Sequence, residues 1–270
     1  MYKDEYLSSR AVKDFMSWLE PILDTPQSFL HSYVHKKHRK TYTFDNLFAA
    51  YKKYDWVYLY TREELSAELA KSIVKSDEHA CENACCEILR WGGVFNRGNK
   101  GRISRLAPNL CAYLSGVRER LALDLPSHEL FVPGMHMTSG FSKIYAAFID
   151  GYMIYDSRVG AALGLLVRTF CMRTNISCVP RELRFSWAGG LESKMSSVSR
   201  RNPSRDGYEF PELLYYRPDR YLENNMRANW LMSAVASATK SEFAGIEEPF
   251  RLRAMEQALF MMGYDVSQPI

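Results

Sequence analysis

The chain contains 270 residues, of which 47% are apolar and 24% are charged. This composition is typical of a globular protein and excludes a disordered tail, a collagen-like repeat and a coiled-coil rod. The chain has 35 lysines and arginines and 31 aspartates and glutamates, so its formal net charge is only +4. The positions of the charges are therefore more informative than their sum.

No apolar run reaches the roughly 18 residues that a membrane span requires. The charged start of the sequence, MYKDEYLSSR, lacks the apolar core of a secretory signal. We therefore expect a cytoplasmic protein that makes no membrane contact and keeps its thiols reduced.

Apolar periodicity predicts a mainly α-helical protein with little β structure. In chain order, helices are expected over 9–23, from the capping box of Thr61 and Glu64, from the Ser76–Asp77 cap to Trp91, and over 106–121, 141–148, 157–172, 225–238 and 249–262. Pro21 is a possible early end of the first helix. Residues 94–102 are expected to form a loop, and 26–60 and 178–215 are left for modest β content.

Candidate metal ligands occur in two places. Cys81, Cys85 and Cys86 fall on one helical segment, where we expect buried structural thiols rather than a metal site, since no second ligand cluster follows. The histidines at 31, 35 and 38 lie in a basic run and form a weaker candidate. We therefore expect neither a metal nor a cofactor.

Basic residues gather in three segments, around 36–53, 97–120 and 194–205. Two of these segments are rich in Gly, Asn and Ser, which suits phosphate binding by backbone N–H groups and guanidinium forks. The candidate phosphate contacts here are Arg97, Lys100, Arg102, Arg200 and Arg201. The competing interpretation is that these are ordinary solvated loops.

Residues 132–166 carry the clearest chemical pattern, which is a loop, a helix, an Asp–Gly turn and a short extended run that leads to Asp156. Asp156 is expected to cap the next helix, where backbone N–H groups and the helix dipole favour the ionised carboxylate. It is then either a structural cap or a charged group held ready to stabilise a cationic transition state.

These residues resemble helix–hairpin–helix DNA glycosylases. The run from Asp156 to Val159 is similar to the catalytic aspartate segment of that superfamily, and Val132-Pro-Gly134 is similar to the hairpin before it. The runs Phe141-Ser-Lys143, Arg90-Trp-Gly-Gly-Val94 and 258–264 resemble bacterial proteins with the 8-oxoguanine-DNA-glycosylase fold. The resemblance is strongest over 88–172.

The resemblance implies a single glycosylase-like domain over 1–270 with two helical lobes, 61–172 and 1–60 plus 173–270, and an active site between them. It implies duplex DNA with a damaged or modified base as the partner, and cleavage of the N-glycosidic bond after the base is flipped out. Asp156 would stabilise the positive charge on the sugar, and Lys143 would attack C1′ to form a Schiff base that permits strand scission. The remaining roles are base-pocket walls for Trp91, Phe141 and Trp187, and DNA contacts for Gly134, His136, Thr138 and Arg158.

Two departures from the superfamily pattern leave the mechanism open. Lys143 lies inside the predicted helix, only 13 residues before Asp156, and Met135–His136 stands where the superfamily has Val-Gly. A monofunctional enzyme that uses water is therefore as consistent with the sequence as a lyase. Two hypotheses without catalysis also stand, a nucleic-acid-binding protein of the same fold and a helical interaction protein of a defence system. The candidate bases are an oxidised purine, an alkylated base and a hypermodified phage pyrimidine, and the setting is either repair or phage defence.

Overall fold

The computed structural model is mainly helical and contains one small antiparallel hairpin, which agrees with the predicted helical class. The residues it describes are 1–35, 39–190, 199–214, 216–248 and 250–267. His38, Lys194 and Pro249, which fall in segments that the sequence analysis considered, lie outside them.

The helices follow one another along the chain as α1 (Lys3–Ser8), α2 (Arg10–Asp24), α3 (Leu47–Lys52), α4 (Arg62–Val74), α5 (Glu78–Trp91), α6 (Arg97–Leu106), α7 (Leu110–Leu121), α8 (Ser139–Phe148), α9 (Ser157–Arg173), α10 (Pro218–Ala238) and α11 (Phe250–Met262). Short 3-10 helices are η1 (Ala107–Asn109), η2 (Arg181–Leu183) and η4 (Glu242–Gly245). The hairpin pairs β1 (His31–His35) with β2 (Lys40–Phe44), with His31 opposite Phe44.

Side-chain caps begin most of the predicted helices. Thr61 and Glu64 form the expected capping box of α4, and Asp77 caps α5. Thr138 accepts a hydrogen bond from the backbone N–H of Phe141 at the start of α8. These caps satisfy N–H groups that the first turn of a helix leaves without an internal partner.

The predicted loop over 94–102 is wrong, because Arg97–Leu106 forms α6. Asn96 caps this helix by accepting the N–H of Asn99 at 2.9 Å. Asn99 and Ile103 are buried on one face, and this packing offsets the low helix propensity of the two glycines in the segment. Arg97, Lys100 and Arg102, which were expected in a loop, therefore lie on a helix.

Other boundaries also differ from the prediction. Pro21 lies inside α2, which continues to Asp24. The helix α10 begins at Pro218 rather than near residue 225, with the proline in its first turn, where a missing N–H costs little. Within the described part of 178–215, β structure is limited to isolated bridges such as Trp187 with Glu212.

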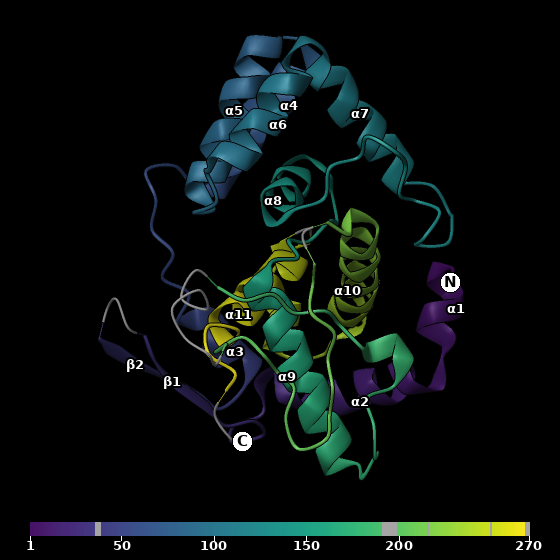
Figure 1. Cartoon of the computed structure of the whole chain (residues 1–270). Helices are drawn as coiled ribbons and strands as arrows, with labels where there is room; N and C mark the ends of the chain where they lie inside the picture. Colours follow the sequence, from purple (N-terminus) through teal and green to yellow (C-terminus); the bar gives the residue numbers. More distant parts are fainter. Residues whose placement is uncertain (36–38, 191–198, 215, 249, 268–270) are drawn as a thin grey trace.

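The helices form two groups (Figure 1). One group contains α4 to α8. The other contains α1 to α3, α9 to α11 and the hairpin, so it joins both ends of the chain. The sequence analysis assigned residues up to 172 to the first lobe, whereas α9 packs against α11 and α2 in the second group. Every residue of α9 from 159 to 171 is buried, as expected of a helix that is apolar on nearly all sides.

A buried ion pair joins the two groups. Arg62 at the start of α4 contacts Glu256 of α11, with 2.6 Å between Nη1 and Oε1, and its Nη2 donates to the carbonyl of Ala146 on α8. The other Glu256 oxygen accepts the N–H of Ile154 at 2.6 Å. The ion pair thus connects α4, α8 and α11 to the extended segment that leads to Asp156.

We predict that Glu256→Gln lowers the free energy of unfolding by about 3 kcal/mol, because it leaves the Arg62 charge buried without a countercharge. The matched control is Glu68→Gln, which removes an exposed ion pair with Lys71 and should cost less than about 1 kcal/mol. Urea denaturation of both variants checks this. Equal effects would show that the buried pair does not join the two helix groups energetically.

Candidate active site

A buried lysine–aspartate pair lies at the junction of α8 and α9. The Nζ of Lys143 is 2.8 Å from Oδ2 of Asp156, and the two residues are only 4% and 7% exposed. The two residues are thirteen positions apart in the sequence, and the turn at Asp150–Gly151 reverses the chain between them and brings them together. Gly151 has a φ of +67°, which glycine tolerates because it has no Cβ.

Asp156 is also the N-cap of α9. Its Oδ1 accepts the backbone N–H groups of Arg158 at 2.9 Å and Val159 at 3.1 Å, so both carboxylate oxygens are hydrogen-bonded. Burial by itself raises the pKa of Asp156. The charge and hydrogen bond of Lys143, the Val159 N–H and the charge of Arg201 outweigh burial and hold that pKa well below its usual range. Asp156 is therefore a stable carboxylate at neutral pH.

Gly92 makes room for the lysine. A Cβ at this position would lie 2.3 Å from Cδ and 2.8 Å from Cε of Lys143. The turn that ends α5 thus lies directly against the aliphatic part of the lysine side chain. Any side chain at position 92 would push Lys143 away from Asp156.

The pair lies in a narrow pocket with aromatic walls. Tyr54, Trp56, Trp91 and Phe260 line it together with Gly92, Ile154, Val159, Glu256 and Gln257. Its free space holds about one water molecule. The pair therefore lies where there is little room for water, and electrostatic interactions there are stronger than in bulk solvent.

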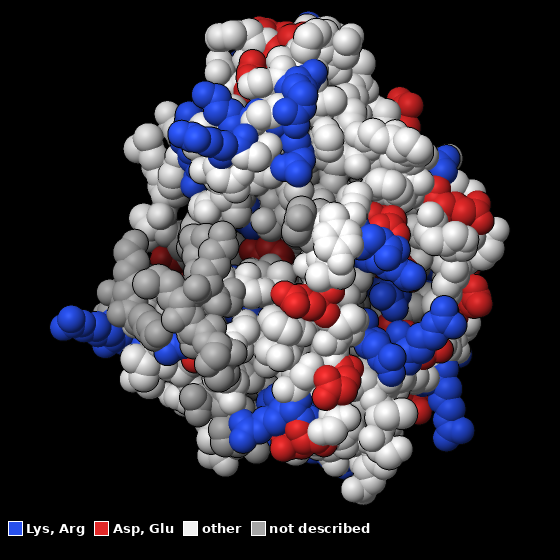
Figure 2. All heavy atoms as spheres, viewed as in Figure 1, with Lys and Arg blue, Asp and Glu red and all other residues white. Residues whose placement is uncertain are grey.

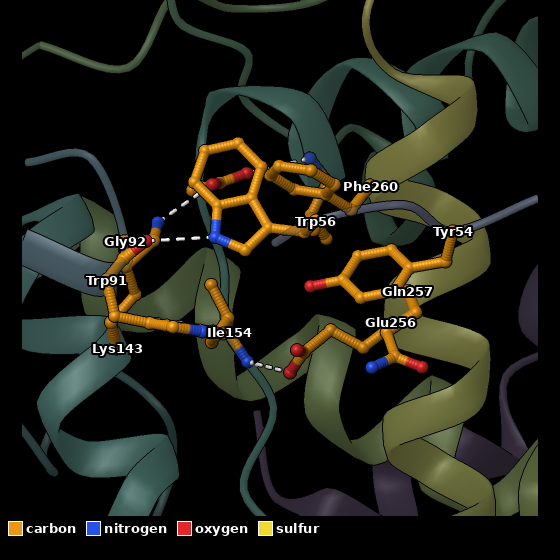
Figure 3. A pocket seen from close by; sticks show the side chains of 11 residues that line it. Tyr54, Trp56, Trp91, Gly92, Lys143, Ile154, Glu256, Gln257 and Phe260 are labelled. Carbon is orange, nitrogen blue, oxygen red and sulfur yellow. Dashed lines mark hydrogen bonds and ion pairs between the residues drawn. The ribbon is translucent and has the colours of Figure 1, made fainter. Parts of the chain in front are cut away.

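Trp56 closes this pocket. Its indole lies between Gly92 and Phe260 (Figure 3), and its Nε1–H donates to the carbonyl of Trp91 at 2.9 Å. The ring meets Phe260 edge-on, with 5.4 Å between centroids. Trp56 is nevertheless 37% exposed.

Gly263, directly after α11, lets the end of this helix pack closely against α9. A Cβ on Gly263 would lie 1.8 Å from the carbonyl oxygen of Arg158, so only glycine permits this approach of α11 to the first turn of α9. Arg158 stacks on Phe260, with its Cζ 4.2 Å from the ring centroid, and lies over Tyr264 as well. Arg158, which was expected to contact DNA, is thus half-buried and packs against the aromatic wall of the pocket.

The other two expected base-pocket residues do not line the pocket. Phe141 is fully buried on α8, with its ring 5.1 Å from that of His136. Trp187 is half-buried and donates its Nε1–H to the carbonyl of Phe210. Trp91 is the one expected wall residue that lines the pocket.

The expected hairpin forms a compact turn. The N–H of Met135 donates to the carbonyl of Val132 at 3.0 Å, and Gly134 has φ of +90°. The backbone of His136 is held by the hydroxyls of Tyr113 and Tyr145. Burial, together with the charges of nearby arginines of α6, lowers the pKa of His136. Gly134 is exposed at the tip.

Basic side chains gather over α6 (Figure 2). Arg97, Lys100 and Arg105 are exposed on this helix, and Arg102 is half-buried. Thr138, which follows the hairpin, donates to Asn99 of α6 at 3.1 Å, and this contact joins the basic helix to the start of α8.

Arg200 and Arg201 have internal contacts. Arg200 lies 3.6 Å from the carboxylate of Asp265. Arg201 donates to the hydroxyl of Ser157, next to Asp156, and lies against Gly190. Arg201 therefore adds positive charge at the start of α9.

No group of three or more His, Cys, Asp or Glu residues suited to a metal ion occurs among the described residues. His31 is instead buried, with its Nε2 3.0 Å from the carbonyl of Met262. Cys81, Cys85 and Cys86 are buried free thiols, as predicted. Within the described ranges, no helix is long and apolar enough to cross a membrane.

Comparisons with protein-family models, with curated proteins and with solved structures find no match to this chain. The site must therefore be interpreted from its own geometry.

Sequence reasoning missed the side of the pocket that is formed by Tyr54, Trp56, Glu256, Gln257 and Phe260. They come from the segment after α3 and from α11, which are far from Asp156 in sequence. Phe260 and Gly263 lie within the run 258–264 that carried part of the resemblance, and this run was the only available signal.

We predict that Gly92→Ala lowers the free energy of unfolding by about 2 kcal/mol, because the added methyl group overlaps a buried side chain. Gly116→Ala on α7 is the control, since a Cβ there meets nothing within 4 Å, and helix propensity favours alanine. Thermal or chemical denaturation distinguishes the two. If Gly92→Ala is as stable as Gly116→Ala, Lys143 is not confined as described.

The depressed pKa of Asp156 predicts a pH-dependent stability. Its contribution is complete above the pKa of an unfolded aspartate, about 4, and is lost as pH falls toward the lower folded-state pKa. Asp156→Asn should therefore cost about 3 kcal/mol at pH 7, and the difference from wild type should shrink below about pH 4. Urea titrations between pH 7 and pH 3 measure it. A constant difference would contradict the ionised pair.

Proposed function

We propose that the protein is a DNA glycosylase that flips a damaged or modified base out of duplex DNA and cleaves its N-glycosidic bond. The observation that carries the proposal is the buried pair of Lys143 and Asp156 at 2.8 Å in an aromatic pocket. The order of hairpin, helix, turn and capping aspartate is the one that resembles helix–hairpin–helix glycosylases. The two helix groups are consistent with the two lobes of that fold.

In the proposed reaction the base leaves with the electron pair of the C1′–N bond, and positive charge develops on the sugar. Asp156, which is ionised while this charge develops, stabilises it. The Nζ of Lys143 gives a proton to Asp156, which lies within hydrogen-bond distance, and forms the bond to C1′. Because the carboxyl has a depressed pKa, the proton passes on to the departing base. The C1′–O4′ bond of the sugar then breaks, O4′ keeps its electron pair and takes a proton from the new C1′ amine, and the resulting Schiff base permits strand cleavage.

Aromatic walls suit a flipped base. Trp91 and Phe260 offer ring faces and edges for stacking. A base does not fit beside Trp56 in its present position, since the free space holds about one water molecule. The proposal therefore requires the exposed Trp56 side chain to move when a base enters.

The basic surface of α6 would bind the DNA backbone. The hydrogen bond from Thr138 to Asn99 holds this helix, and so its exposed cations, close to the hairpin. Phosphate contacts of this kind position the duplex without reading its sequence.

The closed pocket favours a second candidate function, a non-catalytic nucleic-acid-binding protein of the same fold. In that case the buried pair is only structural, and Trp56 stays in place. A defence-system protein that binds an acidic partner through α6 is the third candidate, and it predicts no preference for DNA.

A base-release assay tests the proposed activity. Wild type, Asp156→Asn and Lys143→Gln are incubated with duplexes that carry oxidised, alkylated or hypermodified bases. We expect release of at least one base by wild type and a loss of about 100-fold or more in Asp156→Asn, since a charge-stabilising group is removed. Release that is unchanged in both variants would refute the assigned site, and circular dichroism controls for folding.

Salt-dependent binding tests the interface. We predict that Arg97→Gln combined with Lys100→Gln weakens duplex binding several-fold and reduces the slope of log K against log salt by about 2, or roughly 0.9 per lost phosphate contact. Arg10→Gln on α2, a cation that is 96% exposed, is the control. If both proteins bind with the same slope, the duplex does not lie on α6.

A further inference from the structure

A second positively charged site lies away from the lysine–aspartate pocket. An open groove runs between η2 and the first turns of α10. Five arginines line it, namely Arg181, Arg184, Arg217, Arg220 and Arg227. The groove shares no residue with the pocket around Asp156, so the duplex-binding proposal does not account for it.

Two of these arginines are neutralised locally. Arg217 contacts Asp219 through Nη2 at 2.7 Å, and Arg220 contacts Glu223 at 2.7 Å. The adjacent carboxylates neutralise these two charges, so Arg217 and Arg220 contribute little positive potential to the groove.

The other three have no ion pair with a carboxylate among the described residues. Arg184 donates to the carbonyl of Val179 at 3.2 Å, and Arg227 donates to the carbonyl of Arg181 at 3.3 Å. A carbonyl accepts a hydrogen bond but does not cancel a charge.

We propose that this arginine groove binds a compact phosphoanhydride ligand, the chain of a di- or triphosphate. Guanidinium groups bind phosphate oxygens through paired N–H donors. Three guanidinium groups without a paired carboxylate line one groove, and they can together bind a small ligand that carries several negative charges. An extended DNA backbone fits less well, because its regular charges would also pass the carboxylate of Glu212 in the same groove.

The ligand has two possible sources with the same chemistry, free polyphosphate and a nucleoside triphosphate. Pro211 and Leu214 line one part of the groove, and Leu214 is a partly exposed apolar side chain. This apolar surface would contact the base of a nucleotide, whereas inorganic triphosphate would leave it free.

Isothermal titration calorimetry of the full chain with inorganic triphosphate and with adenosine triphosphate, at low salt, tests the proposal. We expect wild type to bind triphosphate, and the double variant Arg181→Gln/Arg184→Gln to bind it at least about tenfold more weakly, since charge-assisted hydrogen bonds are lost. Both arginines are exposed, so the double variant should fold. Arg10→Gln is the control and should bind like wild type. Tighter binding of the nucleotide than of triphosphate would identify the nucleotide as the ligand, and equal binding would identify the polyphosphate chain.

Two results would overturn the proposal. One is the absence of triphosphate binding by wild type at millimolar concentration, and the other is unchanged affinity in the double variant. Loss of triphosphate binding in the α6 variant Arg97→Gln/Lys100→Gln, with the groove variant unaffected, would assign the anion to the other basic surface. None of these results bears on base release, which is measured separately.

Discussion

The site depends on a buried charge pair that the rest of the structure must stabilise. Removing Lys143 and Asp156 from water costs several kcal/mol for each ion, and their mutual attraction offsets this only when the geometry is good and the remaining hydrogen-bonding groups are satisfied. The start of α9 satisfies the second oxygen of Asp156 with two backbone N–H groups. The carboxylate is thus at once a helix cap, a countercharge and the candidate reactive group.

Close backbone approaches hold this geometry. The Gly92 turn confines the lysine from the side of α5, and Gly263 lets α11 reach the first turn of α9. Glu256 bonds both Arg62 and the backbone of Ile154, two residues before Asp156. The pocket is therefore built between the two helix groups, and the same contacts that join the groups also position the pair.

The sequence predicted the parts of the site that local patterns determine. A capping aspartate before an apolar helix, a Pro–Gly turn and a capping box are set by residues within one turn of each other, and the structure has all three. The nearness of Lys143 to Asp156 was also expected, although the usual superfamily position is different. The helical state of α6 was missed, because its two glycines favour a loop and only the buried face formed by Asn99 and Ile103 reverses that preference.

What the sequence did not predict depends on long-range packing. Trp56 and Phe260 meet across about two hundred residues of chain, and nothing in either segment indicates the other. The same holds for Arg62 with Glu256. Trp187 was expected to be a wall of the base pocket, yet its indole N–H is committed to the carbonyl of Phe210. Composition near a site does not determine where a side chain points.

The most direct measurement is mass spectrometry of the protein after borohydride reduction in the presence of a duplex whose base it releases. The central claim is that the amine beside Asp156 attacks the sugar. We predict a reduced DNA adduct on the peptide that contains Lys143, and no adduct when Lys143→Gln is treated in the same way. An adduct on a different lysine, or base release without any adduct, would contradict the claim and would assign the attack to another group or to water.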